Sequence, residues 1–412
     1  LALIGWIFGL SDYTADWTAI GNALPDALIY LRLIPLLAGT LLPLVIYYLC
    51  RRLDISKIAS LTVALLICLE SSLIVQSRFI LPDLIMLLIG FGSFLCYFEY
   101  RQRLKKVENY RLFLYSSIIL ASLAFSIKWT GLSFLFLIIL LEGYEIIGSR
   151  SQTQKPLYQA IKKFCIFIFQ STVISFVIYA AFFAIHFALL PKSGPGDLFM
   201  SPRFQKTLSG NQHASDPNLV APKFPSKFLE LNWVMITGNV DMTATHSYSS
   251  EWYTWPLMWR SIFYWQSAST TAPTYSYIYL LGNPFIYWFG TVSILSLFIF
   301  FIVSYFSRNL FLDEPTKKKV LLFIMIGYAI NFIPFAYISR VMFLYHYETA
   351  LVFSIISLAF LLDFLKGKKK ILIATLIILV SLSAFLYWSP LTYGRPLSDE
   401  QLKSRMWLPT WR

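Results

Sequence analysis

Charged side chains lie inside or at the ends of several long apolar stretches of this sequence. Glu70 precedes Arg78 within one stretch, and Asp83 begins the next stretch after Pro82. A charge inside a membrane is costly and usually faces protein or water, where it marks a functional site. Cations near a membrane surface suit the phosphate of a lipid, and nearby acids could orient them or act as a base. The cations in such positions are Arg32, Arg78, Lys128 and Arg340, and His346 lies near the last of them.

The composition indicates that a membrane surrounds much of the chain. Of 412 residues, 57% are hydrophobic and 13% are charged, and the mean hydropathy is +0.64. A soluble domain has about a quarter of its residues charged. The net charge of +13 would suggest nucleic-acid binding in a soluble protein, so the positions of the basic residues decide between the two interpretations.

Ten apolar runs approach the ~20 residues that a membrane-spanning helix needs. They predict an all-α polytopic membrane protein with about ten transmembrane helices and a long loop after the sixth helix. The runs cover residues 27–50, 55–77, 80–99, 112–127, 130–147, 164–190, 284–306, 320–338, 343–364 and 371–388.

Basic residues are concentrated in every second connection between these runs. The positive-inside rule therefore places these connections at the cytoplasmic face, and the charged residues described above at or near the outer face. The net charge is mostly a consequence of topology, which argues against nucleic-acid binding. The basic residues concerned are Arg51, Arg52, Lys57, Arg101, Arg103, Lys105, Lys106, Arg111, Arg150, Lys155, Lys162, Lys163, Arg308, Lys317, Lys318, Lys319, Lys366, Lys368, Lys369 and Lys370.

The connection over residues 191–283 is expected to lie at the outer face. It opens with Ser193-Gly194-Pro195-Gly196, a combination that ends a helix, and Ser201-Pro202 then predicts the start of a short one. Gly194 and Gly196 could let the backbone approach a substrate closely. Asp197 could cap the following turn or contact the substrate, and both interpretations stay open.

The same connection contains an aromatic segment, "HSYSSEWYTWPLMWRSIFYW" (246–265), which includes His246, Trp252 and Trp255. Three interpretations remain open for it: aromatic rings that stack on a sugar, a helix lying on the membrane surface, and a belt at the membrane interface.

Several common kinds of site are not indicated. The sequence has no glycine-rich phosphate loop that opens a helix, no HExxH segment and no paired CxxC. The four histidines are scattered, and the four cysteines lie in or beside apolar runs, so neither a metal nor a disulfide framework is expected. No cofactor is predicted.

An ordered series of segments resembles the protein O-mannosyltransferases, which are polytopic glycosyltransferases of the GT-C fold class. The segment "SGPGDLFMSPRFQ" is the most specific, and "THSYSSEWYTWPLM" is the next. The others, spread over nearly the whole chain, are "LRLIPLLAGTLLPLVIYYLCRRL", "ESSLIVQSRFILPD", "SIKWTG", "LLGNPFIYW", "SRVMFLYHY" and "PLTYGRPLSDEQLKSRMWLPTW".

The resemblance implies an inverting transfer of mannose from a polyprenyl-phosphate-mannose donor to serine or threonine hydroxyls of a protein, with a possible homo- or heterodimer. It implies that Arg32, Arg78, Lys128 and Arg340 bind the donor phosphate. Residues expected to support the site or to bind substrate are Glu70, Asp83, Trp129, Gly194, Gly196, Asp197, His246, Trp252, Trp255, His346 and Tyr347.

The sequence also departs from the family pattern. The family's base belongs to an Asp-Glu pair in the first outer loop, followed by His-Pro-Pro, and neither is present. Leu1–Gly9 resembles the part of the family sequence that comes directly after His-Pro-Pro, so we expect the pair and one span to lie upstream of Leu1. His246-Ser247 stands where the family often has His-Pro. The outer connection is too short for the β-trefoil of eukaryotic members, which favours a bacterial-type protein in a plasma membrane over one in the endoplasmic reticulum.

The expected organisation has four parts. Residues 1–190 form a GT-C transmembrane core, 191–283 an extracytoplasmic loop, 284–388 the C-terminal transmembrane helices and 389–412 an extracytoplasmic tail. Three alternative functions remain: transfer of another lipid-linked sugar or transfer onto a lipid, transport of lipid-linked sugars, and an inactive partner subunit. The gathering of charges at one leaflet argues against transport.

Overall fold

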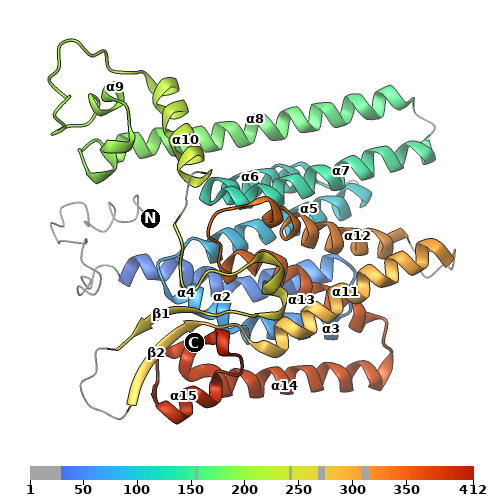
Figure 1. Cartoon of the computed structure of the whole chain (residues 1–412). Coiled ribbons are helices and arrows are strands. Elements are labelled where there is room, and N and C mark those ends of the chain that lie inside the picture. The colour runs from blue at the N-terminus through green and yellow to red at the C-terminus, as the bar shows by residue number, and fades with distance from the viewer. Residues whose placement is uncertain (1–28, 107, 154–155, 241–243, 268–273, 308–314) are drawn as a thin grey trace.

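The computed structural model describes residues 29–106, 108–153, 156–240, 244–267, 274–307 and 315–412. Leu1–Gly9 and the basic residues Lys155 and Arg308 lie outside these ranges. Long helices lie side by side in a bundle, and the connection over 191–283 and the C-terminal segment lie at one of its ends (Figure 1).

Within the described residues, eight helical segments are long and apolar enough to cross a membrane. A ninth span is a bent pair of helices, and α6 (Arg111–Ile127) is a shorter apolar helix. The predicted helical membrane protein is confirmed, since each of the ten apolar runs falls on one of these segments. The long helices are α2 (Ile29–Arg52), α5 (Asp83–Lys106), α7 (Leu132–Thr153), α8 (Leu157–Leu189), α11 (Pro284–Ser307), α12 (Pro315–Ile330), α13 (Glu348–Asp363) and α14 (Gly367–Tyr393).

The second apolar run is not one straight helix. It is divided into α3 (Lys57–Cys68) and α4 (Ser71–Arg78), which meet at 53°. Glu70 lies at the break, where its carboxylate accepts a hydrogen bond from the backbone N–H of Ser72 (3.0 Å) and so caps α4. The sequence pattern predicted a continuous span because an apolar run does not reveal a cap within it.

The connection over 191–283 and the C-terminal segment together form a small sheet that was not predicted from the sequence. Its strands are β1 (Ile262–Gln266), β2 (Thr274–Leu280) and β3 (Pro396–Ser398), in the order β1-β2-β3 with antiparallel pairing. Aromatic and β-branched residues in β1 and β2 favour the extended conformation. The sheet therefore joins segments that are more than a hundred residues apart in the sequence.

The C-terminal segment also holds the connection over 191–283 through side chains. Trp411 is fully buried, its indole donates to the carbonyl of Met258 (2.7 Å), and its carbonyl accepts from the Ser261 hydroxyl (2.6 Å). The short elements near this end of the bundle are η4 (Pro195–Phe199), α9 (Pro202–Gln205), α10 (Phe224–Val240), η5 (Trp252–Leu257), α15 (Asp399–Arg405) and η8 (Pro409–Trp411). Ser201 caps α9 as predicted (3.3 Å to the Phe204 N–H).

An aromatic core fixes the helices that carry the candidate site. Phe91 and Phe94 of α5 pack against Phe134 of α7 and Phe353 of α13, with ring centroids 5.3–6.0 Å apart. A Cβ atom at Gly90 would lie 2.4 Å from the Phe134 ring, so α5 and α7 approach closely because this residue is glycine. The first turns of α5 and α13 carry Asp83 and Glu348, and this packing holds both in place.

Candidate active site

A cavity of about 760 Å³ lies among α5, α6, α7, α8, α10 and the segment that joins α12 to α13. That segment contains two short helical turns, η6 (Ile333–Tyr337) and η7 (Leu344–Tyr347). Most of the lining is hydrocarbon, as in many ligand pockets, and a few polar groups converge on it. The polar or titratable lining residues are Asp83, Lys128, Thr130, Ser133, Thr172, Ser175, Tyr179, Asn232, Asn331, Tyr345, His346, Glu348 and Thr349.

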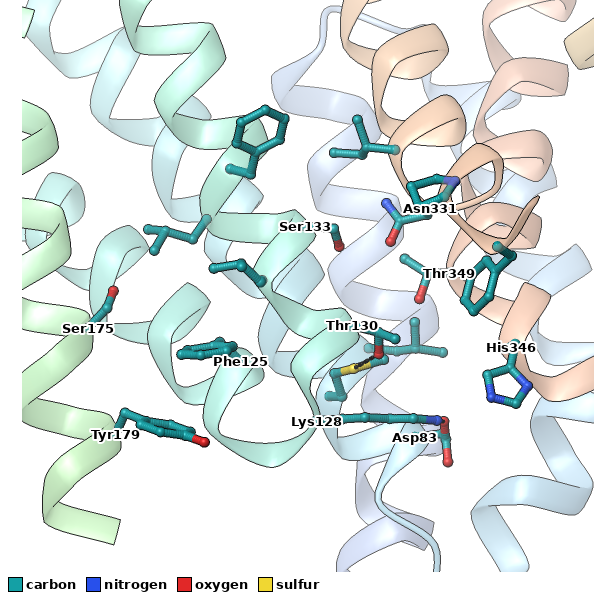
Figure 2. A pocket seen from close by; sticks show the side chains of 18 of the residues that line it. Asp83, Phe125, Lys128, Thr130, Ser133, Ser175, Tyr179, Asn331, His346 and Thr349 are labelled. Atoms are coloured by element: carbon teal, nitrogen blue, oxygen red, sulfur yellow. Dashed lines mark hydrogen bonds and ion pairs between the residues drawn. The ribbon is translucent and has the colours of Figure 1, made fainter. Parts of the chain in front are cut away.

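Asp83 and Lys128 form an ion pair in this cavity. The ammonium group of Lys128 lies 2.7 Å from Oδ1 of Asp83, in the first turn of α5, and 5.0 Å from the centre of the Tyr345 ring. Lys128 follows α6 in an extended conformation and precedes η3 (Trp129–Gly131), so its side chain leaves the helical path. Figure 2 shows the two charged groups next to each other. The carboxylate orients a lysine that keeps further donors for an anion.

His346 forms another part of the cavity wall. Its ring is stacked on Trp255 (5.9 Å between centroids, 12° between planes) and on Tyr345 (4.4 Å, 26°). Nδ1 lies within hydrogen-bonding distance of the backbone nitrogen and oxygen of Phe343 (3.2 and 3.0 Å). Trp255 is fully buried and its indole donates to the Ser250 hydroxyl (2.9 Å), so it supports His346 from behind and is closed to a sugar ring.

A hydrogen-bonded chain closes the opposite wall. The Trp129 indole donates to the Tyr179 hydroxyl (2.9 Å) of α8, and this hydroxyl donates to Oδ1 of Asn232 (2.6 Å) of α10. Tyr179 and Asn232 line the cavity, and Figure 2 shows Tyr179 across from His346. Trp129 therefore ties the turn after Lys128 to the helix that covers the cavity.

The structure places two of the predicted residues in the protein core. Glu70 is fully buried and accepts from the Ser72 hydroxyl (3.0 Å) and the Asn283 N–H (3.0 Å), which joins α4 to the start of α11. Tyr347 is also fully buried, with its hydroxyl 3.2 Å from that of Tyr328. Neither residue lines the cavity.

Of the four predicted phosphate-binding cations, only Lys128 lines the cavity. Arg340 is half-buried and acts electrostatically on Tyr345 and His346, which do line it. Arg78 donates to the carbonyl of Thr392 (2.7 Å) and lies over the Tyr393 ring, at the end of α14. Arg32 is exposed on α2. The structure thus separates cations that the sequence pattern grouped together.

The turn at Ser193–Asp197 lies outside the cavity lining. Asp197 accepts hydrogen bonds from the Ser193 hydroxyl (2.5 Å), the Asn211 amide (2.6 Å) and the Gly194 N–H (3.1 Å). These bonds, chiefly that from Ser193, hold the pKa of Asp197 below its ordinary value. Of the two roles left open for this residue, the structure shows the cap. A Cβ atom at Gly194 or Gly196 would have no atom within 4 Å, so neither glycine is required by close packing within the described chain.

The aromatic segment over 246–265 does not form a helix on the membrane surface. It contains the turn η5 and the strand β1. His246 is exposed, and its Nδ1 accepts from the Tyr248 N–H (3.1 Å). Trp252 packs edge-on against Phe332 (4.9 Å). Of the three interpretations left open for this segment, the structure does not have the surface helix, because proline and alternating aromatic residues favour a turn and a strand here.

Several residues of the site were not predicted from the sequence. Tyr179, Asn232 and Asn331 are uncharged, and their sequence positions give no sign that they converge on one cavity. Glu348 did give a signal, since it is an acid within a long apolar run directly after His346 and Tyr347.

Two family descriptions match this chain in consecutive segments. Residues 1–191 match the family described as dolichyl-phosphate-mannose-protein mannosyltransferase. Residues 224–411 match the C-terminal four-transmembrane region of protein O-mannosyltransferase. Together the two matches leave out little more than part of the outer connection, and both name the same family.

Individual relatives carry corresponding names. Dolichyl-phosphate-mannose–protein mannosyltransferase 5 of Candida albicans is 33% identical over 207 residues, which is 46% of this chain and 29% of the relative. Protein O-mannosyl-transferase 1 of Danio rerio is 31% identical over 215 residues, 50% of this chain and 29% of the relative. The matched segments thus cover less than a third of the length of these relatives.

The fold has a counterpart among solved structures. The S. cerevisiae protein O-mannosyltransferase Pmt1-Pmt2 complex bound to the sugar donor matches with a TM-score of 0.88 and 17% identity, over 100% of this chain and 85% of that one. The agreement extends over all of the helical bundle and supports the GT-C assignment. With both family matches and this fold, the chain is an integral membrane protein that belongs to the protein O-mannosyltransferase family.

Proposed function

We propose that this chain belongs to a membrane enzyme that transfers mannose from a polyprenyl- or dolichyl-phosphate-mannose donor to serine or threonine hydroxyls of proteins. The observation that carries the proposal is the cavity with the Asp83–Lys128 pair at its polar part and hydrocarbon over most of its remaining wall. A donor of this kind has the same division, with a charged phosphate and an apolar chain. The family membership supports the choice of mannose.

In the proposed reaction the acceptor oxygen attacks the anomeric carbon of mannose, and the bond from that carbon to the phosphate oxygen breaks. The configuration inverts, and the lipid phosphate leaves with the bonding electrons. Lys128 stabilises the negative charge that develops on the phosphate, and Asp83 holds the ammonium group in place. The acceptor's proton passes to a carboxylate, which acts as the general base. No described residue is assigned that role.

The proposal extends to location and assembly. The polar part of the cavity would lie at the outer leaflet, with 191–283 and 389–412 outside and the basic connections inside. The core over 1–190 and the helices over 284–388 would both contribute to the site. A bacterial plasma membrane is proposed over the endoplasmic reticulum, and a homo- or heterodimer as the assembled form. Arg340 would assist Lys128 from the edge of the cavity.

The test is a transfer assay on the full-length protein with a radiolabelled polyprenyl-phosphate-mannose donor and a serine- and threonine-containing peptide. Lys128→Ala should lower kcat/KM at least about tenfold, since a hydrogen bond to a charged group contributes about 1.5–3 kcal/mol. Lys128→Arg should retain part of the activity because it keeps the charge.

Other outcomes would identify the alternatives. Transfer of a different sugar, or of mannose onto a lipid alone, would replace the proposed substrate. A wild-type protein that binds the donor without transferring its sugar would indicate a partner subunit.

A further inference from the structure

Glu348, in the first turn of α13, is a buried acid without a hydrogen-bond partner among the described residues. The residue is 2% exposed, and neither Oε1 nor Oε2 meets a donor there. It lines the cavity that contains Asp83 and Lys128. Buried polar groups in native proteins are nearly always satisfied, so the missing donors are expected from a molecule that occupies the cavity.

The other buried glutamates of the described chain show what a structural role looks like here. Glu142 accepts from the hydroxyls of Tyr97 and Tyr100 (both 3.0 Å) and from Arg101 (3.3 Å). Glu70 accepts from the backbone and hydroxyl of Ser72 and from the backbone of Asn283. Described parts of the fold hold both of these acids with several hydrogen bonds, whereas Gln76 is the one described side chain placed to donate to Glu348.

The surroundings of Glu348 favour a ligand that brings hydroxyl groups. Gln76 neighbours it, but the amide nitrogen of Gln76 donates to the Tyr264 hydroxyl (3.3 Å), and its Oε1 has no partner in the described chain. If the Gln76 amide is turned over, its nitrogen can donate to one oxygen of Glu348, and the other oxygen still lacks a donor from the described residues. A metal ion could also satisfy this oxygen, but the described residues contain no group of three or more His, Cys, Asp or Glu side chains that could hold one. Sugar hydroxyls supply several donors without a charge.

We propose that Glu348 binds hydroxyl groups of the donor sugar while Lys128 binds the donor phosphate. This rests on the proposed function. In such a donor the phosphate is attached to the anomeric carbon, so the sites for phosphate and sugar must be adjacent. Lys128 and Glu348 meet that requirement, because they line one cavity and interact electrostatically. Glu348 would determine sugar specificity and take no part in bond making.

The experiment compares two lipids on the purified full-length protein in detergent. One is polyprenyl phosphate and the other is polyprenyl-phosphate mannose of the same chain length. Loss of a sugar contact that involves a charged acceptor should reduce the preference for the mannosylated lipid at least about tenfold in Glu348→Gln and Glu348→Ala. The Kd for polyprenyl phosphate should stay within about twofold of wild type, which also shows that the variants fold.

Two control variants separate specificity from general damage. Lys128→Ala should weaken binding of both lipids by a similar factor and leave their ratio nearly unchanged. Glu142→Gln removes charge from a buried acid that has its own donors and lies outside the cavity lining, so it should leave the ratio unchanged.

Three results would overturn the proposal. The Glu348 variants could keep the wild-type ratio, or they could weaken both lipids equally, as a structural residue would. They could also raise the KM for the acceptor peptide with an unchanged lipid ratio, which would assign Glu348 to the acceptor hydroxyl.

Binding and transfer fail in different ways. If wild type binds the mannosylated lipid through Glu348 but transfers nothing, the proposed enzyme activity is wrong and the sugar contact stands. If wild type transfers mannose and the Glu348 variants keep the wild-type ratio of the two lipid Kd values, only the proposed sugar contact is wrong.

Discussion

Single side chains show how well a charge at the end of an apolar run predicts a functional site. Asp83 and Lys128 were predicted because each is a charge at the end of an apolar run, and they form the ion pair of the cavity. Arg78 satisfied the same criterion, yet it binds the end of α14. The position of a charged residue within an apolar run can be predicted from the sequence. The partner of its long side chain depends on helices that are far away in the chain.

Uncharged site residues were beyond prediction for a related reason. Tyr179 and Asn232 join Trp129 in one hydrogen-bonded chain, but each is an ordinary polar residue in its own segment. Their hydrogen bonds form only after α8 and α10 have packed near the turn at Lys128. Glu348 differs, since an acid inside an apolar run is informative from the sequence alone.

The cap at Asp197 predicts a pH-dependent turn. Because hydrogen bonds lower the pKa of Asp197 in the folded turn, their stabilisation is complete above the ordinary value of 3.8 and is lost as the pH falls through the lower folded value. Amide hydrogen exchange at Gly194, corrected for intrinsic rates, should therefore show less protection in that acidic range. Asp197→Asn should remove this pH dependence, and an unchanged profile in that variant would contradict the assignment.

At the level of helices and strands, run length and composition were sufficient for the membrane spans and insufficient for their interruptions. The break between α3 and α4 arises because a buried acid caps the second helix, and its donors come partly from Asn283, more than two hundred residues later. The strands β1 and β2 are short and aromatic. In a chain rich in apolar runs, such a pattern is hard to distinguish from aromatic residues that lie at a membrane interface.

Helix packing gives a matched pair of substitutions in α5. Gly90→Ala would place a methyl group 2.4 Å from the Phe134 ring, whereas the nearest atom to the new Cβ in Gly92→Ala is a Leu120 methyl at 3.9 Å. Overpacking typically costs about 1–3 kcal/mol, so Gly90→Ala should lower the Tm in detergent and Gly92→Ala should not. Equal Tm values for the two variants would show that α5 and α7 are free to separate.

For the whole molecule, the distribution of charge predicted which connections share a face. The long connection and the C-terminal segment indeed gather at one end of the bundle (Figure 1). Which end faces the cytoplasm is decided during insertion into the membrane, where basic connections favour the cytoplasmic side.

That orientation can be measured with single cysteines in a background without Cys50, Cys68, Cys96 and Cys165. Asn218 and Lys106 are both exposed and lie in the outer and a basic connection, respectively. A membrane-impermeant maleimide should label Asn218→Cys in intact cells and Lys106→Cys only after permeabilisation. The reverse pattern would invert the proposed topology and place the cavity's polar part at the cytoplasmic leaflet.

The sheet shared by the connection over 191–283 and the C-terminal segment sets an order of events during biosynthesis. β2 ends at Leu280, but β3 and Trp411 leave the ribosome only 116 to about 130 residues later. At about 5–20 residues per second this is a delay on the order of ten seconds. During that interval four further helices must be inserted while one edge of β2 waits unpaired. The nascent connection over 191–283 is therefore open to proteases and chaperones until translation has almost finished.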